Sequence, residues 1–194
     1  MHLALNPQVQ AKLHEELVKA VGETEGKITA KTLERKLTPY LHACIKETYR
    51  LTMPFGVVTS KKTSQSEVEV HGVTLPKGSM VSLNNKWYDE LVLKDAREFK
   101  PERWFPDAVE SRVGTELEQM DHALFRDSFG QGARRCPGNR VATNEVLTMV
   151  SQLILDFEMK FNPEVKILDD IKYKMVAVVT PIIPQMEFKR REGG

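Results

Sequence analysis

Apolar residues recur at helical spacing in two stretches of the chain. The first opens at Asn6-Pro7 and continues to about Val21, with an apolar face of Val9, Leu13, Leu17 and Ala20. The second runs from Asn139 to about Phe157, with an apolar stripe of Val141, Ala142, Val146, Met149, Val150, Leu153 and Ile154. Spacings of three and four residues place such positions on one side of an α-helix. Both stretches are therefore predicted to be helices that pack against a core.

The region between these helices is predicted to hold only short elements. Brief strands are expected at residues 57–59, 68–70 and 80–83. Residues 22–36 read as a charged, mobile connection, and residues 84–130 as mostly irregular with brief helical turns. Residues 174–183 alternate weakly, and the chain then turns at Pro181 and Pro184. The pattern indicates one continuous unit, mainly α with small β-sheets (α+β), although a long irregular stretch is unusual unless it is functional.

Composition excludes several classes of protein. The 28 basic and 27 acidic residues balance, so no nucleic-acid footprint is present. Two cysteines are too few for a disulfide framework, and their number is consistent with a reducing compartment. No apolar run reaches the length of a membrane span, and the histidines lack metal-ligand spacing.

The most specific chemistry lies in residues 129–138, where a cysteine ends a glycine-rich run just ahead of the second helix. A thiol near a helix N-terminus is stabilised as thiolate, and glycines let the backbone approach a bulky partner. The arginines of this run supply charge for an anionic partner. A small buried cysteine and a phosphate cradle are the alternatives. Neither a P-loop nor a dinucleotide fingerprint is present.

The run resembles the haem-binding loop of the cytochrome P450 family, Phe-x-x-Gly-x-Arg-x-Cys-x-Gly. The matching positions are Phe129, Gly132, Arg134, Cys136 and Gly138. Two further segments are similar to family signatures. Residues 38–51 resemble its Glu-x-x-Arg helix, and residues 99–105 resemble the loop that carries a second arginine.

The resemblance implies a structural cluster and a set of cofactor contacts. By spacing alone, Glu47 and Arg50 would be an ordinary surface pair on one helical face. In the family, Arg103 would complete a buried lock with them. Haem (iron protoporphyrin IX) would be the cofactor and Cys136 the axial ligand of its iron. The remaining expected contacts are Phe129 shielding the sulfur, Arg134 and Lys61 on the propionates, Ala142 at a further matching position, and the amides of Gly138 and Asn139 on the sulfur.

The resemblance covers only the C-terminal part of the family's fold. It implies that residues 1–194 are a single partial domain containing the Glu-x-x-Arg helix, the meander, the cysteine loop and the helix that follows. The distal helix with its acid-threonine pair is not matched. Gly22-Glu23-Thr24 follows the first helix and is rejected as that pair. The chain is therefore expected to be a fragment, with no catalytic residue beyond the haem ligand.

The function implied is that of a haem-thiolate monooxygenase that hydroxylates an apolar small molecule. Electrons would come from a flavoprotein reductase or a ferredoxin, on a basic face for which Arg126, Arg135 and Arg140 are candidates; a merely solvated surface is the alternative. Val179 and Thr180 are candidates for substrate contact. A non-catalytic haem-binding or haem-sensing module, and an inactive interaction protein, remain as alternatives. The family suggests membrane association in the endoplasmic reticulum or mitochondrion, through an N-terminal region outside this chain.

Overall fold

The computed structural model describes residues 1–52, 58–63, 66–70, 72–122, 128–161, 165–175 and 179–191. The α-helices are α1 (His2–Leu5), α2 (Pro7–Gly22), α3 (Pro39–Leu51), α4 (Asn85–Val92), α5 (Pro106–Glu110) and α7 (Asn139–Asp156). Short 3₁₀ helices are η1 (Pro101–Trp104), η2 (Glu116–Asp121), η3 (Gly132–Arg134) and η4 (Leu168–Asp170). The strands are β1 (Val58–Lys62), β2 (Val68–Val70), β3 (Val73–Leu75), β4 (Met80–Asn84), β5 (Phe157–Phe161), β6 (Tyr173–Met175), β7 (Val179–Pro181) and β8 (Met186–Arg190).

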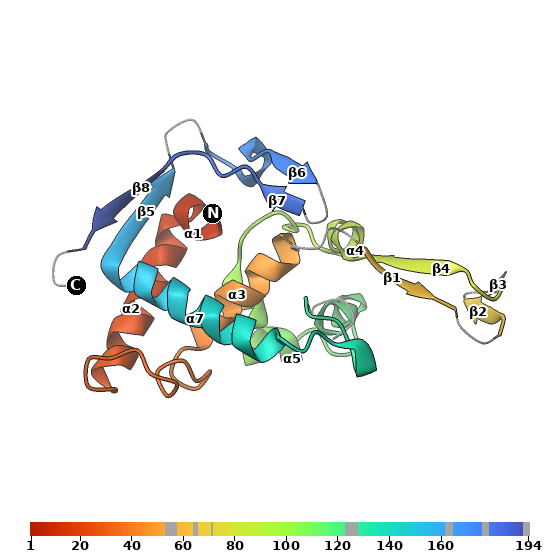
Figure 1. Cartoon of the computed structure of the whole chain (residues 1–194), viewed down its shortest axis with the longest axis horizontal. Coiled ribbons are helices and arrows are strands. Elements are labelled where there is room, and N and C mark those ends of the chain that lie inside the picture. The colour runs from red at the N-terminus through yellow and green to blue at the C-terminus, as the bar shows by residue number, and fades with distance from the viewer. Residues whose placement is uncertain are drawn as a thin grey trace.

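Helices α2, α3 and α7 pack together at the centre of the molecule (Figure 1). The predicted apolar face of α2 is confirmed, because all of its members are buried: Val9, Leu13, Leu17 and Ala20. The predicted stripe of α7 is partly wrong. Val141 and Met149 are each 63% exposed, and the residues that α7 buries are Leu147, Ser151 and Ile154. The face of α7 that packs on the core therefore includes only part of the predicted apolar stripe.

The strands form four antiparallel pairs, β1–β4, β2–β3, β5–β8 and β6–β7. The first pair extends away from the helices as an arm, with β2–β3 at its tip (Figure 1). The predicted strands at 68–70 and 80–83 are confirmed, and residues 58–59 of the third belong to β1, whereas residue 57 lies outside the described residues. The weak alternation at 174–183 corresponds to β6 and β7. The sequence analysis missed β3 and the β5–β8 pair.

Strand β5 is held from the side by a glutamine of α2. Gln10 is fully buried, and its Oε1 accepts a hydrogen bond of 2.8 Å from the backbone amide of Met159. Its Nε2 donates to the carbonyls of Met159 and Leu3, both at 3.0 Å. The carboxamide therefore pairs with β5 much as a neighbouring strand would, and satisfies buried backbone groups.

The connection between α2 and α3 is built around buried threonines. Thr24 and Thr32 share a hydrogen bond of 2.8 Å between their hydroxyls, and the Thr24 hydroxyl also donates to the carbonyl of Lys27 at 2.8 Å. The segment expected to be a charged, mobile connection thus has a hydrogen-bonded interior. Thr24 itself is buried, and its hydroxyl is used in these structural bonds.

The N-terminus of helix α3 is capped by a side chain of α2. Thr38 occupies the N-cap position but its side chain makes no capping bond. Instead, the carboxylate of Glu16 on α2 accepts hydrogen bonds from the backbone amides of Tyr40 and Leu41, at 2.7 and 2.9 Å. These amides belong to the first turn, which has no acceptors within the helix. Glu16 thus caps α3 from another element.

The fold class predicted from the sequence, mainly α with small β-sheets, is confirmed. Residues 84–130 contain α4, which is longer than the brief turns expected there, besides η1, α5 and η2. That residues 1–194 form a single partial domain stays a prediction.

Candidate functional site

The cysteine loop is a compact turn immediately before α7. The amide of Cys136 donates to the carbonyl of Phe129 at 2.9 Å, and the amide of Arg135 donates to the carbonyl of Gly132 at 3.0 Å. Gly130 and Gly132 have φ values of 77° and 74°, a backbone region that favours glycine. Glycine is therefore favoured at both positions because the backbone of the loop has positive φ there.

The thiol of Cys136 is exposed at the N-terminal end of α7. A Cβ built on Gly138 would lie 3.8 Å from the Cys136 sulfur, so a side chain there would rest against the thiol. The amide of Asn139, expected to reach the sulfur, donates instead to the Cys136 carbonyl at 3.3 Å. The turn that starts α7 directs this amide to the backbone oxygen. The amide of Ala142 is used within the helix start, donating to Gly138 at 3.0 Å.

Several predicted residues fall where the structure describes no side chain. The side chains of Arg134 and Lys61 are in this class, although the Lys61 backbone pairs with Val81 in the β1–β4 ladder. Arg126 lies outside the described residues altogether. Their roles toward a cofactor or partner stay predictions, as does shielding of the sulfur by Phe129. The remaining two candidates for the basic face, Arg135 and Arg140, are exposed.

A buried charge cluster lies between α3 and η1, and it contains the predicted trio. Arg50 donates to both carboxylate oxygens of Glu47, from Nε at 2.9 Å and from the terminal nitrogen at 2.8 Å. Arg103 donates from Nε to Glu47 at 3.2 Å. Glu47 is 0% exposed and Arg50 is 7% exposed. The structure thus brings together residues that spacing alone would have placed in a surface pair.

Donors that the sequence analysis did not single out complete the shell around this carboxylate. The indole N–H of Trp104 donates to Glu47 Oε2 at 2.9 Å, and the backbone amide of Lys100 donates to Oε1 at 3.0 Å. The Lys46 ammonium lies 4.1 Å from the centre of the Trp104 ring. Trp104 is half-buried, and a tryptophan N–H removed from water usually finds an acceptor. Its place next to Arg103 in the sequence was the one available hint of this bond.

Carbonyls and further carboxylates fix the two arginines on their outer sides. Arg50 donates to the carbonyl of Ala96 at 2.6 Å, and Arg103 pairs with Asp95 at 2.7 Å. Burial pushes the pKa of Arg50 down, but the hydrogen bond and charge of Glu47 outweigh it and raise that pKa. Burial likewise pushes the pKa of Asp95 up, yet hydrogen bonds from Arg103 and Lys100 lower it to about 2. Every charge in the cluster therefore has an opposite charge in contact.

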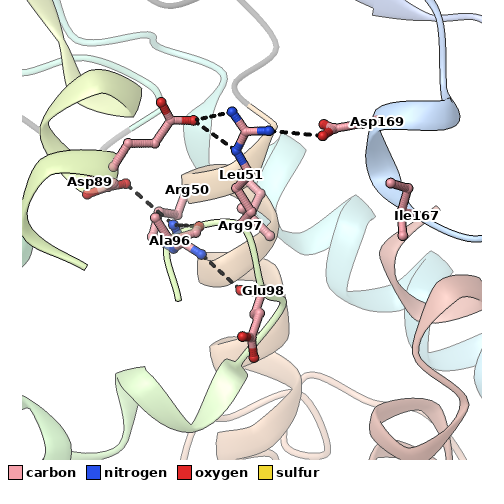
Figure 2. Close-up of a pocket in the computed structure, with 9 residues that line it drawn as sticks. Arg50, Leu51, Asp89, Ala96, Arg97, Glu98, Ile167 and Asp169 are labelled. Atoms are coloured by element: carbon pink, nitrogen blue, oxygen red, sulfur yellow. Dashed lines mark hydrogen bonds and ion pairs between the residues drawn. The ribbon is translucent and has the colours of Figure 1, made fainter. Parts of the chain in front are cut away.

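A pocket of about 240 Å³ opens beside Arg50 (Figure 2). At its mouth, the exposed Arg97 bridges Glu90 at 3.2 Å and Asp169 at 3.0 Å. Asp89 lies 3.6 Å from Arg50. Figure 2 shows Asp89 facing Arg50 and Asp169 facing Arg97. Because all four residues line the pocket, the buried Arg50 and the exposed ion pair of Arg97 belong to one cavity wall.

The three sequence motifs are therefore linked through α3. Its Glu47 holds Arg103 of η1, and its Tyr49 contacts Phe129 at the start of the cysteine loop. A family model described as Cytochrome P450 matches residues 1–187. The chain belongs to the cytochrome P450 family. This confirms the resemblance predicted from the motifs.

Relatives from animals and plants match this cytochrome P450 chain over most of its length. Cytochrome P450 CYP12A2 of Musca domestica is 33% identical over 195 residues, which cover 96% of the chain and 34% of that relative. Geraniol 8-hydroxylase of Swertia mussotii is 36% identical over 158 residues, covering 80% of the chain and 29% of that relative. Probable cytochrome P450 12a5, mitochondrial, of Drosophila melanogaster is 32% identical over 169 residues, covering 84% and 31%. The chain spans about a third of the length of the curated relatives it matches.

Two further features concern membrane spans and metal ligands in the described part of the chain. None of the helices described there is long and apolar enough to cross a membrane. In the same residues, no group of three or more histidine, cysteine, aspartate or glutamate side chains is placed to hold a metal ion.

Proposed function

We propose that this chain forms the haem-binding part of a haem-thiolate monooxygenase, with Cys136 as the ligand of the haem iron. The observation that carries the proposal is the exposed thiol of Cys136 at the head of α7, in a chain that belongs to the cytochrome P450 family. When bound, haem supplies the capacity to activate oxygen and hydroxylate an apolar substrate.

The residues of the cysteine loop fit such a group. A side chain added at Gly130 or Gly132 would meet nothing within 4 Å, so the loop presents open space beside its backbone. The Cys136 thiol is accessible, and its neighbour Gly138 carries no side chain that would crowd it. An accessible thiolate with an unobstructed flank is what a large planar ligand requires.

The chain's own residues would orient and stabilise the ligand. The Phe129 carbonyl accepts the Cys136 amide and so fixes the Cys136 backbone just before the first turn of α7. Arg134 is proposed to pair with one propionate by a charge-assisted bond, and Lys61 with the other. The Glu47 cluster would hold η1 against α3, the helix whose Tyr49 contacts Phe129 of the cysteine loop.

Electron delivery is proposed to use a separate protein with an acidic surface. Arg135 and Arg140 are exposed next to the cysteine loop, which places positive charge close to the proposed cofactor. Some relatives are named as mitochondrial, and a ferredoxin would suit a location of that kind, whereas a flavoprotein reductase would suit the endoplasmic reticulum. The substrate is proposed to be an apolar small molecule, in keeping with a relative named geraniol 8-hydroxylase.

Carbon monoxide spectroscopy of the purified chain tests the ligand assignment. Haem is added, the sample is reduced and carbon monoxide is bubbled through; a strongly red-shifted Soret band is expected from thiolate ligation. Cys136→Ala should abolish that band. Cys44→Ala is the matched control, since Cys44 is the other cysteine and is buried in the core, and it should keep the band.

The outcomes separate the possible functions. An unshifted spectrum in the unaltered chain, or a shifted one in Cys136→Ala, overturns the proposed ligand. A shifted band without turnover in the presence of a reductase would indicate a haem-binding module that does not itself catalyse hydroxylation. Turnover with an apolar substrate would establish the monooxygenase.

A further inference from the structure

Tyr49 lies on α3 between Glu47 and Arg50, yet its ring meets the cysteine loop. The ring centres of Tyr49 and Phe129 are 6.2 Å apart and their planes make an angle of 86°. An edge-to-face arrangement at this separation is the favoured geometry for two aromatic rings. The contact joins the helix of the charge cluster to the segment that carries the cysteine.

Phe129 is in turn bonded to the cysteine itself. Its carbonyl oxygen accepts the Cys136 amide, so a shift of Phe129 moves the acceptor that fixes the Cys136 backbone. Gly130 and Gly132 adopt positive φ, and glycine backbones have wide conformational freedom. A loop that contains such glycines needs contacts with side chains outside the loop to stay in one conformation.

Helix α3, which carries Tyr49, is held in place by buried ionic bonds. On either side of Tyr49, Glu47 and Arg50 are buried and bonded to each other at 2.8 Å. Tyr49 is half-buried, and burial raises the pKa of its hydroxyl, so the ring stays neutral at physiological pH. The ring edge that faces Phe129 is therefore carried by a fixed, uncharged side chain.

We propose that Tyr49 is a positioning residue for the cysteine loop, holding Phe129 and through it the Cys136 backbone in a fixed relation to α3. The inference deepens the proposed function, because the loop is the proposed haem-ligand loop. The aromatic contact itself does not depend on haem. Its consequences are therefore measurable in the chain with and without the cofactor.

Hydrogen exchange of the purified chain, read by mass spectrometry on a peptide covering residues 128–138, tests the role. Tyr49→Leu should speed exchange there by roughly 2- to 10-fold, the factor that the loss of one aromatic pair corresponds to. Tyr49→Phe keeps the ring and should match the unaltered chain. In haem-loaded samples, Tyr49→Leu should also hasten loss of the red-shifted carbon monoxide band, and Tyr49→Phe should not.

A control elsewhere separates a local effect from a general one. Phe188 makes a similar edge-to-face pair with Phe157, at 6.0 Å and 89°, on the β5–β8 sheet. Phe188→Leu should leave the 128–138 peptide unchanged. Exchange in α2 reports any global loss of stability caused by Tyr49→Leu.

A double-mutant cycle keeps the proposal testable even if Tyr49→Leu loosens the whole fold. Because the two rings act as a pair, Tyr49→Leu combined with Phe129→Leu should speed loop exchange no more than Phe129→Leu alone. Additive effects, or unchanged exchange in Tyr49→Leu, overturn the positioning role. If the unaltered chain binds no haem, the proposed function fails, while the exchange data still decide the role of Tyr49.

Discussion

Replacing Glu47 with glutamine should destabilise this protein more than any surface substitution. Glutamine keeps the shape of the side chain but removes the charge that Arg50 and Arg103 face. Arg50 would remain almost fully buried, with Asp89 at 3.6 Å as its nearest remaining carboxylate. It would keep the Ala96 carbonyl as an acceptor. A buried cation would therefore lose its main counterion.

The geometry makes the loss larger than a simple removal of charge. Both oxygens of Glu47 accept hydrogen bonds. Oε1 accepts from Arg50, Arg103 and the Lys100 amide, and Oε2 accepts from Arg50 and Trp104. A glutamine has only one such oxygen, so its NH₂ group would face donors in either orientation. Breaking a buried ion pair costs about 3–5 kcal/mol. We expect a loss of about 4 kcal/mol, a large part of the roughly 5–15 kcal/mol that stabilises a typical domain.

Urea unfolding followed by far-ultraviolet circular dichroism measures this loss as a lower midpoint with an unchanged slope. Asp169→Asn is the matched control. It removes the charge of an exposed pair, whose Arg97 and Asp169 side chains are 68% and 60% exposed, so it should change stability by only about 0–1 kcal/mol. If Glu47→Gln costs no more than that control, the reasoning from burial and donor saturation is wrong.

Three further substitutions test other parts of the fold. Ser151→Ala should stabilise the chain by about 1–2 kcal/mol and raise its melting temperature, because the buried Ser151 hydroxyl has no hydrogen-bond partner in the described residues; a lower melting temperature would contradict this. Gln10→Leu should cost about 2–4 kcal/mol and speed exchange of the Met159 amide, which Gln10 now accepts; unchanged exchange would rule out the strand-like pairing. Asp95 has a pKa lowered to about 2 from 3.8, so it adds stability above pH 3.8 that is lost as the pH falls toward 2. Asp95→Asn should flatten the acid side of the stability curve, and an equally steep curve would show that the pair with Arg103 does not stabilise the fold.

Periodicity predicted where the helices lie better than which way they face. The bounds of α2 and α7 fell within a residue or two of the expected ends. Yet α7 buries Ser151 and exposes Val141 and Met149, so hydrophobicity alone did not identify its inward side. Which face is buried depends on the neighbours that α7 meets, and the sequence of one helix does not contain that information.

Long-range hydrogen bonds were the least predictable part of the structure. The family resemblance selected Glu47, Arg50 and Arg103, which spacing alone would not have grouped, and the fold brings them together. Trp104 was missed because its bond to Glu47 depends on how η1 packs against α3. The pairing of β5 with β8 was missed for a similar reason, since β5 follows α7 directly and its partner lies far along the chain.

The cap that Glu16 places on α3 has a consequence for folding. Without that carboxylate the helix has no side-chain acceptor at its N-cap, and a segment of 13 residues is marginally helical on its own in water. Helices α2 and α3 should therefore become protected from exchange together, as one cooperative unit. The Glu47 cluster and the contact of Tyr49 with the cysteine loop would then form in the same step, so loss of the Glu16 carboxylate on α2 would also loosen that loop.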